Sequence, residues 1–313
     1  MQLFWRNPSL AFPDLAPAPR GSQRGRGQNM SGSARRRLAA LAAGVLAAGG
    51  ALCVASPASA IASPVLVEAS SALNANNFKN ATATCAVGQR VYGAAFVVVD
   101  GLGRVAVNTA QPSSNLSSVL VEAMEVAPVS TSWRVIAQAI CGPPVAGLQR
   151  VSATTSDAAI PSKTVKASCP SSQKPYGAGF VFTNGYAEAF LNQMVVTMGS
   201  GSVTSGVTVR GDLDDTLLNW SATAYAICGA PSPNQAVITS SNYVFDSATP
   251  KDASASCPSG TRLHGVGLIR TGAETDVLTE DVGAGPSSAS GKAYENDSTS
   301  ASWAVIPQAV CAS

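Results

Sequence analysis

Six of the seven cysteines in this chain recur as three pairs at similar spacing. Their thiols could form disulfides or act as nucleophiles. In each pair a glycine stands eight residues after the first cysteine, and a tryptophan stands eight residues before the second. An even number of cysteines in a secreted chain indicates disulfides, and the repeat favours one bridge inside each copy. With these thiols paired, none of them remains as a nucleophile. The pairs are Cys85 and Cys141, Cys169 and Cys228, and Cys257 and Cys311.

The three tryptophans of this frame, Trp133, Trp220 and Trp303, allow two interpretations. Exposed indole rings at equivalent positions would form platforms for stacking sugar rings, which suits multivalent carbohydrate binding. Buried rings would instead pack beside the disulfide of their own copy. Strand alternation places Trp133 and Cys141 on one face with small apolar residues between them, which favours burial.

The single histidine, His264, is the natural candidate for a general base or a metal ligand. Tyr92 and Tyr176 occupy its position in the other two copies, so we interpret it as filling a half-buried structural slot. A lone histidine in such a slot also argues against a Ser-His-Asp or Cys-His catalytic set.

Carboxylates need inspection because glycoside hydrolysis requires only two of them. Glu122 and Glu125 of the first copy have odd spacing in a strand, which places them on opposite faces. We interpret them, and the acids clustered in the third copy, as solvated surface groups. These acids are Glu122, Glu125, Asp276, Glu280 and Asp281.

Residues 210–215 read Arg-Gly-Asp-Leu-Asp-Asp, which resembles both an adhesive tripeptide and a calcium loop. The run lacks the spaced ligands and the glycine of a calcium loop, so we interpret it as a polar turn. We therefore expect no catalytic residue, no metal site and no cofactor in this chain.

Basic residues also recur at fixed places in the frame. They serve either to protect the edges of sheets against aggregation or to contact a ligand, and edge protection is the preferred interpretation. Lys79, Lys163 and Lys251 stand six residues before the first cysteine, and Arg90, Lys174 and Arg262 stand five residues after it.

The pattern between these landmarks is that of strands throughout, with about six strands in each copy and no convincing amphipathic helix. The repeat glycines, Gly93, Gly177 and Gly265, predict a bulge or a close backbone approach. We expect an all-β protein of three tandem, disulfide-closed modules at residues 61–141, 142–228 and 229–313. Each module would be a small sandwich or barrel. Separate beads are favoured, and one pseudo-threefold β-prism is the alternative.

Residues 1–60 have the pattern of a secretory leader. Residues 35–37 are arginines, an apolar stretch follows, and Ala58-Ser59-Ala60 offers a cleavage site. Met30 is an alternative start, and an uncleaved membrane anchor is the alternative to cleavage. The leader holds seven Arg and one Asp, so the net charge of +2 becomes −4 in the mature part, which contacts no membrane. With this charge and no basic patch, nucleic acid is not an expected partner.

One string carries a resemblance to a known group of repeats. Cys257-Pro258-Ser259-Gly260-Thr261-Arg262 is followed by Gly265 and Gly267, and the copy closes with Trp303 and Ala309-Val310-Cys311. The pattern resembles a repeat of secreted proteins from actinobacteria, the high-GC Gram-positive bacteria. The first copy departs from it at Ala86 and Ala95. The resemblance implies no activity, because its motifs are structural.

Triplication, the leader and the lack of a catalytic set favour a secreted, non-catalytic protein with several weak, equivalent sites. Its expected ligand is cell-envelope or extracellular polysaccharide. One alternative is a structural component of the cell surface or the spore coat. A second alternative is a hydrolase that uses the surface carboxylates.

Overall fold

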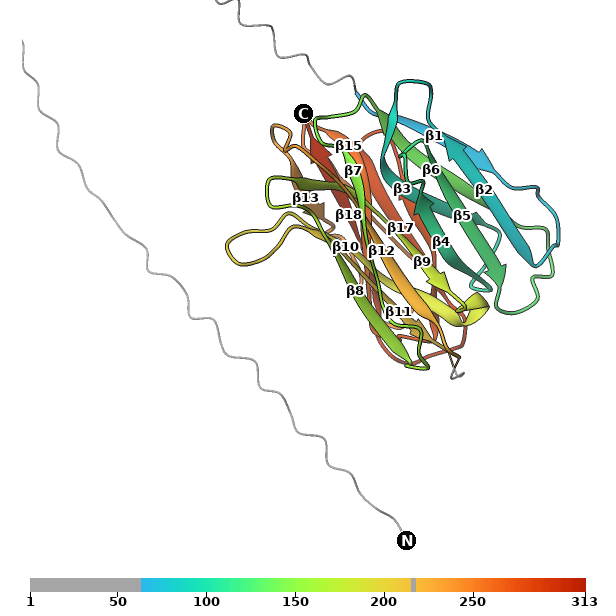
Figure 1. Cartoon of the computed structure of the whole chain (residues 1–313). Coiled ribbons are helices and arrows are strands. Elements are labelled where there is room, and N and C mark those ends of the chain that lie inside the picture. Colours follow the sequence, from blue (N-terminus) through green and yellow to red (C-terminus); the bar gives the residue numbers. More distant parts are fainter. Residues whose placement is uncertain (1–62, 215–217) are drawn as a thin grey trace, which may run out of the picture. The chain divides into compact units, whose positions relative to one another are not determined.

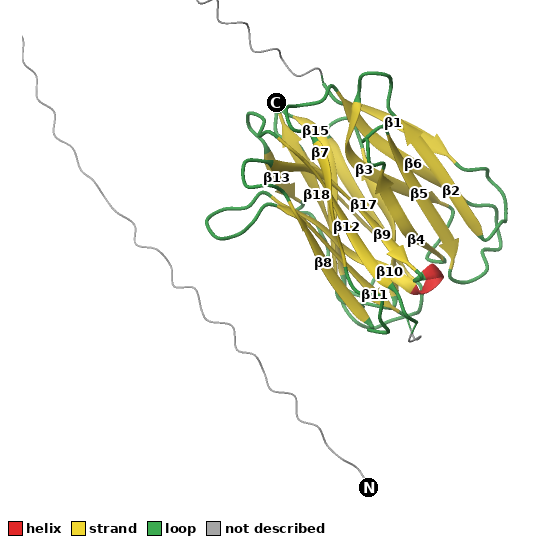
Figure 2. Cartoon of the chain, viewed as in Figure 1, coloured by secondary structure: helices red, strands yellow, loops and turns green. Residues whose placement is uncertain are grey.

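Strands make up almost all the regular structure of the computed structural model, which describes residues 63–214 and 218–313 (Figure 2). The predicted all-β class is confirmed. The predicted leader at residues 1–60 lies outside the described residues.

The strands follow one another in three groups of six. The first group is β1(Val65–Ser70), β2(Phe78–Thr84), β3(Arg90–Val99), β4(Val105–Pro112), β5(Ser118–Glu125) and β6(Arg134–Gly142). The second is β7(Gln149–Thr154), β8(Ser162–Ser168), β9(Lys174–Thr183), β10(Ala189–Thr197), β11(Gly206–Leu213) and β12(Ser221–Gly229), with the short 3-10 turn η1(Tyr186–Glu188) before β10. The third is β13(Ala236–Thr239), β14(Lys251–Ser256), β15(Arg262–Thr271), β16(Val277–Ala284), β17(Ser288–Glu295) and β18(Ala304–Ala312).

Each of the three six-stranded sheets takes half of its strands from one module and half from another (Figure 1). Because this sharing is cyclic, the modules close around a pseudo-threefold axis, as in the prism alternative. The expectation of separate beads is wrong, since no module owns a whole sheet. Within each module two three-stranded half-sheets still pack together as a small sandwich. The sheet orders are β1-β6-β3-β16-β17-β14, β13-β18-β15-β10-β11-β8 and β2-β5-β4-β9-β12-β7.

The predicted disulfides form inside the modules and tie the two half-sheets of each sandwich together. Cys85, Cys169 and Cys257 follow the second strand of their module, and each is bonded to a cysteine in the sixth strand. Separations of 56, 59 and 54 residues correspond to roughly 4 kcal/mol of stabilisation per bridge in the chain-entropy model.

The repeat glycines meet where the three modules come together. A Cβ atom on Gly177 would lie 2.2 Å from the backbone oxygen of Tyr92 and 2.7 Å from the Cα of Gly93. A Cβ atom on Gly265 would lie 2.1 Å from the oxygen of Tyr176 and 2.6 Å from the Cα of Gly177. The close approach predicted at these glycines is therefore present, and its partner is the neighbouring module.

The seams between modules are short. Each seam joins the third strand of one module to the fourth strand of another through only two paired residues on each strand. The paired residues are Phe96-Val97 with Asp281-Val282, Phe180-Val181 with Thr109-Ala110, and Leu268-Ile269 with Gln193-Met194.

Long side chains reinforce two of these seams from the strand behind. Gln308 of β18 pairs with Gly267 and reaches across it, and its Oε1 accepts a hydrogen bond from Val196 N at 2.9 Å. In the same way, Oε1 of Gln138 in β6 accepts a hydrogen bond from Ala284 N at 2.8 Å. Both acceptors complete a backbone donor of the neighbouring module that would otherwise be buried without a partner.

The third seam solves the same problem differently. Pro112 stands where the other seams have Val196 and Ala284, and proline has no N–H to satisfy. Tyr225 replaces the glutamine, and its hydroxyl accepts a hydrogen bond from Gln111 Nε2 at 2.6 Å. In this seam, therefore, the backbone donor is absent and the glutamine that would accept from it is replaced as well.

We expect Gly177→Ala to lower the free energy of unfolding by about 3 kcal/mol or more, because the added methyl group meets backbone atoms that cannot turn aside. Gly285→Ala is the control, since its Cβ would approach the Ser288 hydroxyl at 3.1 Å, a group that can rotate. Denaturant unfolding of both variants measures the difference. Equal stabilities would contradict the axial contact.

Gln308→Leu should cost about 1–3 kcal/mol, because it leaves the Val196 N–H buried without an acceptor. Tyr225→Phe at the equivalent position should cost less than about 1 kcal/mol, because Pro112 needs no acceptor. Thermal and denaturant unfolding compare the two, and a larger loss for Tyr225→Phe would refute this account of the seams.

Candidate functional site

The three tryptophans are wholly buried, with no exposed surface on any of them. Each indole N–H has an acceptor: Glu125 Oε1 at 2.7 Å for Trp133, Ile160 O at 2.7 Å for Trp220, and Glu295 Oε1 at 3.3 Å for Trp303. The rings offer no face to a sugar, so the stacking alternative is wrong for these residues and core packing is what the structure shows.

The repeated lysines complete this buried arrangement. Lys79, Lys163 and Lys251 lie on the edge strands β2, β8 and β14, where edge protection predicts them. Their side chains are buried, and each ammonium lies 4.7–5.4 Å from the centre of the tryptophan ring of its own module. An inward-pointing charge on an edge strand disfavours pairing with another chain, and the cation–π contact offsets part of its burial. Lys251 also lines a cavity of about 220 Å³ beside the loop at residues 244–250.

His264 lies in a ring of aromatic side chains on the axis. Its ring centre is 5.4 Å from that of Tyr92 and 5.6 Å from that of Tyr176. The slot is fully buried and not half-buried as predicted, since His264 is 1% exposed and both tyrosines are 0% exposed. Burial lowers the pKa of His264, and its Nε2 has no partner among the described residues. Within the described residues, Arg262 O is the hydrogen-bond partner of the ring, at 3.0 Å from Nδ1.

The connections between modules explain why tyrosine occupies this slot twice. The Tyr92 hydroxyl donates to Pro143 O and accepts from Val145 N, and the Tyr176 hydroxyl donates to Ala230 O at 2.7 Å. These atoms belong to the segments that lead into the second and third modules.

The candidate acids do not converge. Glu122 accepts a hydrogen bond from Thr109 Oγ1 at 2.9 Å, whereas Glu125 Oε1 accepts one from the indole N–H of Trp133 at 2.7 Å. Glu280 is 1% exposed, so its interpretation as a surface acid is wrong. It occupies a bulge of β16 and accepts from Gly103 N at 2.8 Å, across the seam to the first module. Asp281 faces the other way and accepts from Val98 N at 3.2 Å.

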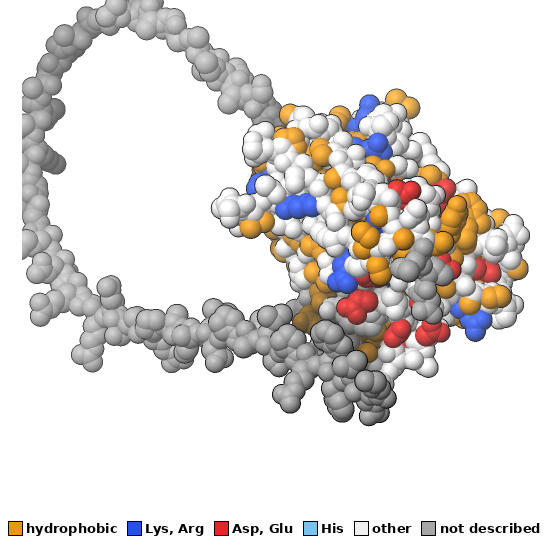
Figure 3. All heavy atoms as spheres, turned by 60° about the horizontal axis from the view of Figure 1, so that its bottom comes forward, with side chains coloured by type: hydrophobic (Ala, Val, Ile, Leu, Met, Phe, Trp, Pro, Cys, Tyr) orange, Lys and Arg blue, Asp and Glu red, His pale blue; other side chains and the backbone are white. Residues whose placement is uncertain are grey.

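The two ends of the modules differ in charge. The third strands begin at Arg90, Lys174 and Arg262, and the connections that follow these strands carry Asp100, Glu188 and Glu274. Ten extended residues separate the two ends by about 30 Å. Acidic side chains gather on the end that comes forward in Figure 3.

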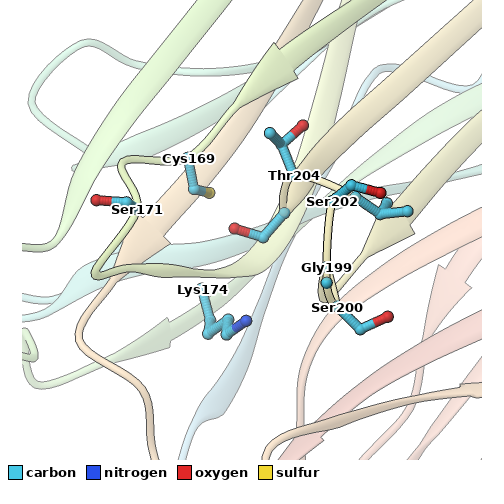
Figure 4. Close-up of a pocket in the computed structure, with 10 residues that line it drawn as sticks. Cys169, Ser171, Lys174, Gly199, Ser200, Ser202 and Thr204 are labelled. Atoms are coloured by element: carbon cyan, nitrogen blue, oxygen red, sulfur yellow. The ribbon is translucent and has the colours of Figure 1, made fainter.

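The basic end carries cavities. One of about 380 Å³ lies between residues 169–174 and the loop at 199–205 (Figure 4). Ser171 and Lys174 line one side of it, and the loop supplies Ser200, Ser202 and Thr204. Lys174 Nζ donates to Met198 O at 2.6 Å, which fixes the ammonium beside these hydroxyls.

A second cavity, of about 460 Å³, lies beside the corresponding turn of the first module. Arg90 stands there in the place of Lys174, and Ser114 and Asn115 come from the turn between β4 and β5. The two cavities thus share a repeated basic residue and a turn rich in hydroxyl or amide groups. Arg90 and Lys174, which were both singled out in the sequence, line these two cavities. The serine-rich turns beside them carried no motif and were missed.

Other classes of site have no support in the described residues. No group of three or more His, Cys, Asp or Glu side chains there is arranged to hold a metal ion. Within the same residues, no helix has the length and apolar character needed to cross a membrane. A scan of protein-family models and a comparison with curated proteins both find no match for this chain.

Burial of the carboxyl groups of Glu280 and Asp281, at the seam between the third and first modules, makes the stability of the protein depend on pH. It raises the pKa of Glu280 to about 7, against the backbone N–H groups that lower it, and it raises the pKa of Asp281 to about 6. A raised pKa in the folded protein means that the contribution of Glu280 is fully present below about pH 4.5 and is lost as the pH rises through about 7.

We therefore expect Glu280 to make the protein less stable at pH 8 than at pH 5, by on the order of 3 kcal/mol at most. Glu280→Gln keeps an acceptor for Gly103 and should flatten this part of the profile, whereas Glu122→Gln should not. The lowered pKa of His264 acts in the opposite sense, so the difference between wild type and variant is what counts. Urea unfolding at both pH values measures the difference in stability between wild type and variant. An unchanged pH dependence in Glu280→Gln would disprove the assignment of this pH dependence to Glu280.

Proposed function

We propose that this protein is secreted and binds cell-envelope or extracellular polysaccharide without transforming it. The observation that carries the proposal is the pair of cavities at the basic end, each lined in part by a repeated basic residue and by the turn between the fourth and fifth strands of its module. Residues 144–150 line the rest of the second cavity. A polysaccharide repeats its own units, so repeated sites on a rigid body suit it.

The lining fits a hydroxylated ligand. Lys174 and Arg90 supply N–H donors, and the serine, threonine and asparagine side chains supply both donors and acceptors. A sugar hydroxyl also donates and accepts. Both cavities are open and have mixed polar and apolar linings, which favours weak binding at each site, so useful affinity would come from several sites acting together.

Secretion agrees with the covalent structure. Three disulfides within one chain indicate an oxidising compartment, which is extracellular for most proteins of this kind. The predicted leader supplies the route out of the cell.

A structural role at the cell surface or in a spore coat is the second candidate. Sheets shared among modules and a disulfide in every module favour it, because they make a body that is hard to take apart. It predicts tight retention in the envelope fraction and no affinity for isolated polysaccharides. The hydrolase alternative gains nothing from Glu280 and Asp281, whose side chains face in opposite directions.

The test is retention of purified 61–313 on insoluble cellulose, chitin and peptidoglycan, with an assay for released reducing sugar. We expect retention without sugar release, and at least about fivefold weaker retention for the double variant Arg90→Ala/Lys174→Ala. Arg104→Ala is the control, since Arg104 is exposed at the opposite end of the strands. No retention on any polysaccharide would remove the proposal, and sugar release would replace it with the hydrolase.

A further inference from the structure

The corner of the third module differs from the corners of the other two. In the first two modules the edge strands β1 and β7 each pair over six residues with the sixth strand of their module. In the third module β13 pairs over only four residues and stops at Thr239. The chain then leaves the sheet, and residues 241–250 are all exposed before β14 begins.

Pro307 explains why the strand stops. It stands opposite Leu268 in β18, where the other modules have Ala137 and Ala224. Those alanines pair with the edge strand of their module. Ser240 N donates to Pro307 O at 2.9 Å, but proline has no N–H to return the bond, so the ladder ends there.

The departing loop forms one wall of a cavity of about 320 Å³ on the outer face of the sheet. A row of charges crosses its floor, because Asp252 and Asp281 both pair with Lys292 in the strand between them. Gly283 leaves room for the Ser290 hydroxyl, since a Cβ atom there would lie 2.5 Å from Ser290 Oγ. The polar lining residues are Asn242, Asp252, Ser254, Asp281, Ser290 and Lys292.

A second, smaller cavity of about 220 Å³ adjoins the first at Asp252, which lines both. The loop that lies beside them exposes three consecutive apolar side chains. Tyr243 is 44% exposed, Val244 62% and Phe245 57%. Val244 lines the smaller cavity, whereas Tyr243 and Phe245 flank it in the loop and line neither cavity. Exposed aromatic rings are costly in water and useful to a ligand that has both an apolar and a polar face.

We propose that this cleft of the third module, between residues 242–252 and the Asp252–Lys292–Asp281 row, binds a neutral saccharide unit. The C–H face of a pyranose would lie on Tyr243 or Phe245. Its hydroxyls would donate to the carboxylates of Asp252 and Asp281 and accept from Lys292 and Asn242. Charges of both signs line the cleft, so no strongly charged ligand is favoured. The inference rests on the proposed function and adds a site that the other two modules lack.

The test titrates ¹⁵N-labelled 61–313 with cellohexaose, mannohexaose and chitohexaose, and with hexagalacturonate as the anionic counterpart. Asp252→Ala and the double variant Tyr243→Ala/Phe245→Ala remove the two parts of the cleft. Asn80→Ala and Leu73→Ala are matched controls, because Asn80 holds the place of Asp252 in the first module and Leu73 is 57% exposed in the corresponding loop. Thermal unfolding verifies that the variants, all at exposed positions, remain folded.

We expect a neutral hexasaccharide to shift the amides of residues 242–254 and 290–292, and both cleft variants to weaken binding at least about tenfold. The controls should bind within twofold of wild type. Binding that the cleft variants leave unchanged but Arg90→Ala/Lys174→Ala weakens would overturn this inference and leave the proposed function standing. Binding of hexagalacturonate alone would overturn the choice of a neutral ligand. No binding of any oligosaccharide, together with no retention on the insoluble polymers, would remove both proposals.

Discussion

Contact between the backbones of Gly93, Gly177 and Gly265 is the constraint on which the rest of this structure depends. Side chains of any size would hold the third strands of the modules apart, and the two-residue seams beside them could not form. Because the seams form, each module presents half a sheet to each neighbour. The apolar faces of the half-sheets then bury one another around a common axis instead of remaining in three small cores, which raises the share of surface that each module buries.

The other repeated residues act within this frame, each on a different part of it. The disulfides tie the two half-sheets of a module, which belong to different sheets of the body, and so hold the outer corners as the glycines hold the axis. The tryptophans fill the space between the half-sheets, and the inward lysines cover them from the edge strands. The tryptophan rings in particular have no exposed surface for a ligand. The cavities of the described residues are lined largely by turns and loops whose sequences differ from module to module.

Much of the fold could be predicted from the sequence because its causes are local. Cysteine spacing, strand alternation from Trp133 to Cys141 and the repeat itself indicate three disulfide-closed β-modules and buried tryptophans. The sharing of sheets could not be predicted in this way, because each seam rests on two residue pairs between strands far apart in the chain. Glu280 was misread for a related reason: its neighbour Asp281 faces outward, and only the bulge turns Glu280 toward the turn of another module. A signal for the open corner was present in Pro307, which interrupts a strand where the other modules have alanine.

Departures from the repeat therefore tell more about recognition than the repeat does. His264 replaces a tyrosine whose hydroxyl, in the other two modules, bonds the connection to the next module, and its ring keeps the contacts with the two tyrosine rings on the axis. Pro307 is different, because a proline in a strand costs a ladder bond and the same place tolerates alanine twice. The lost ladder bond affects one corner of the third module. There the chain leaves the sheet after Thr239, Tyr243 and Phe245 are exposed in the loop, and Asp252 lines a cavity. Equivalent cavities at the basic end would supply weak contacts to a repeating polymer, and a single cleft on the third module would decide which sugar that polymer must contain.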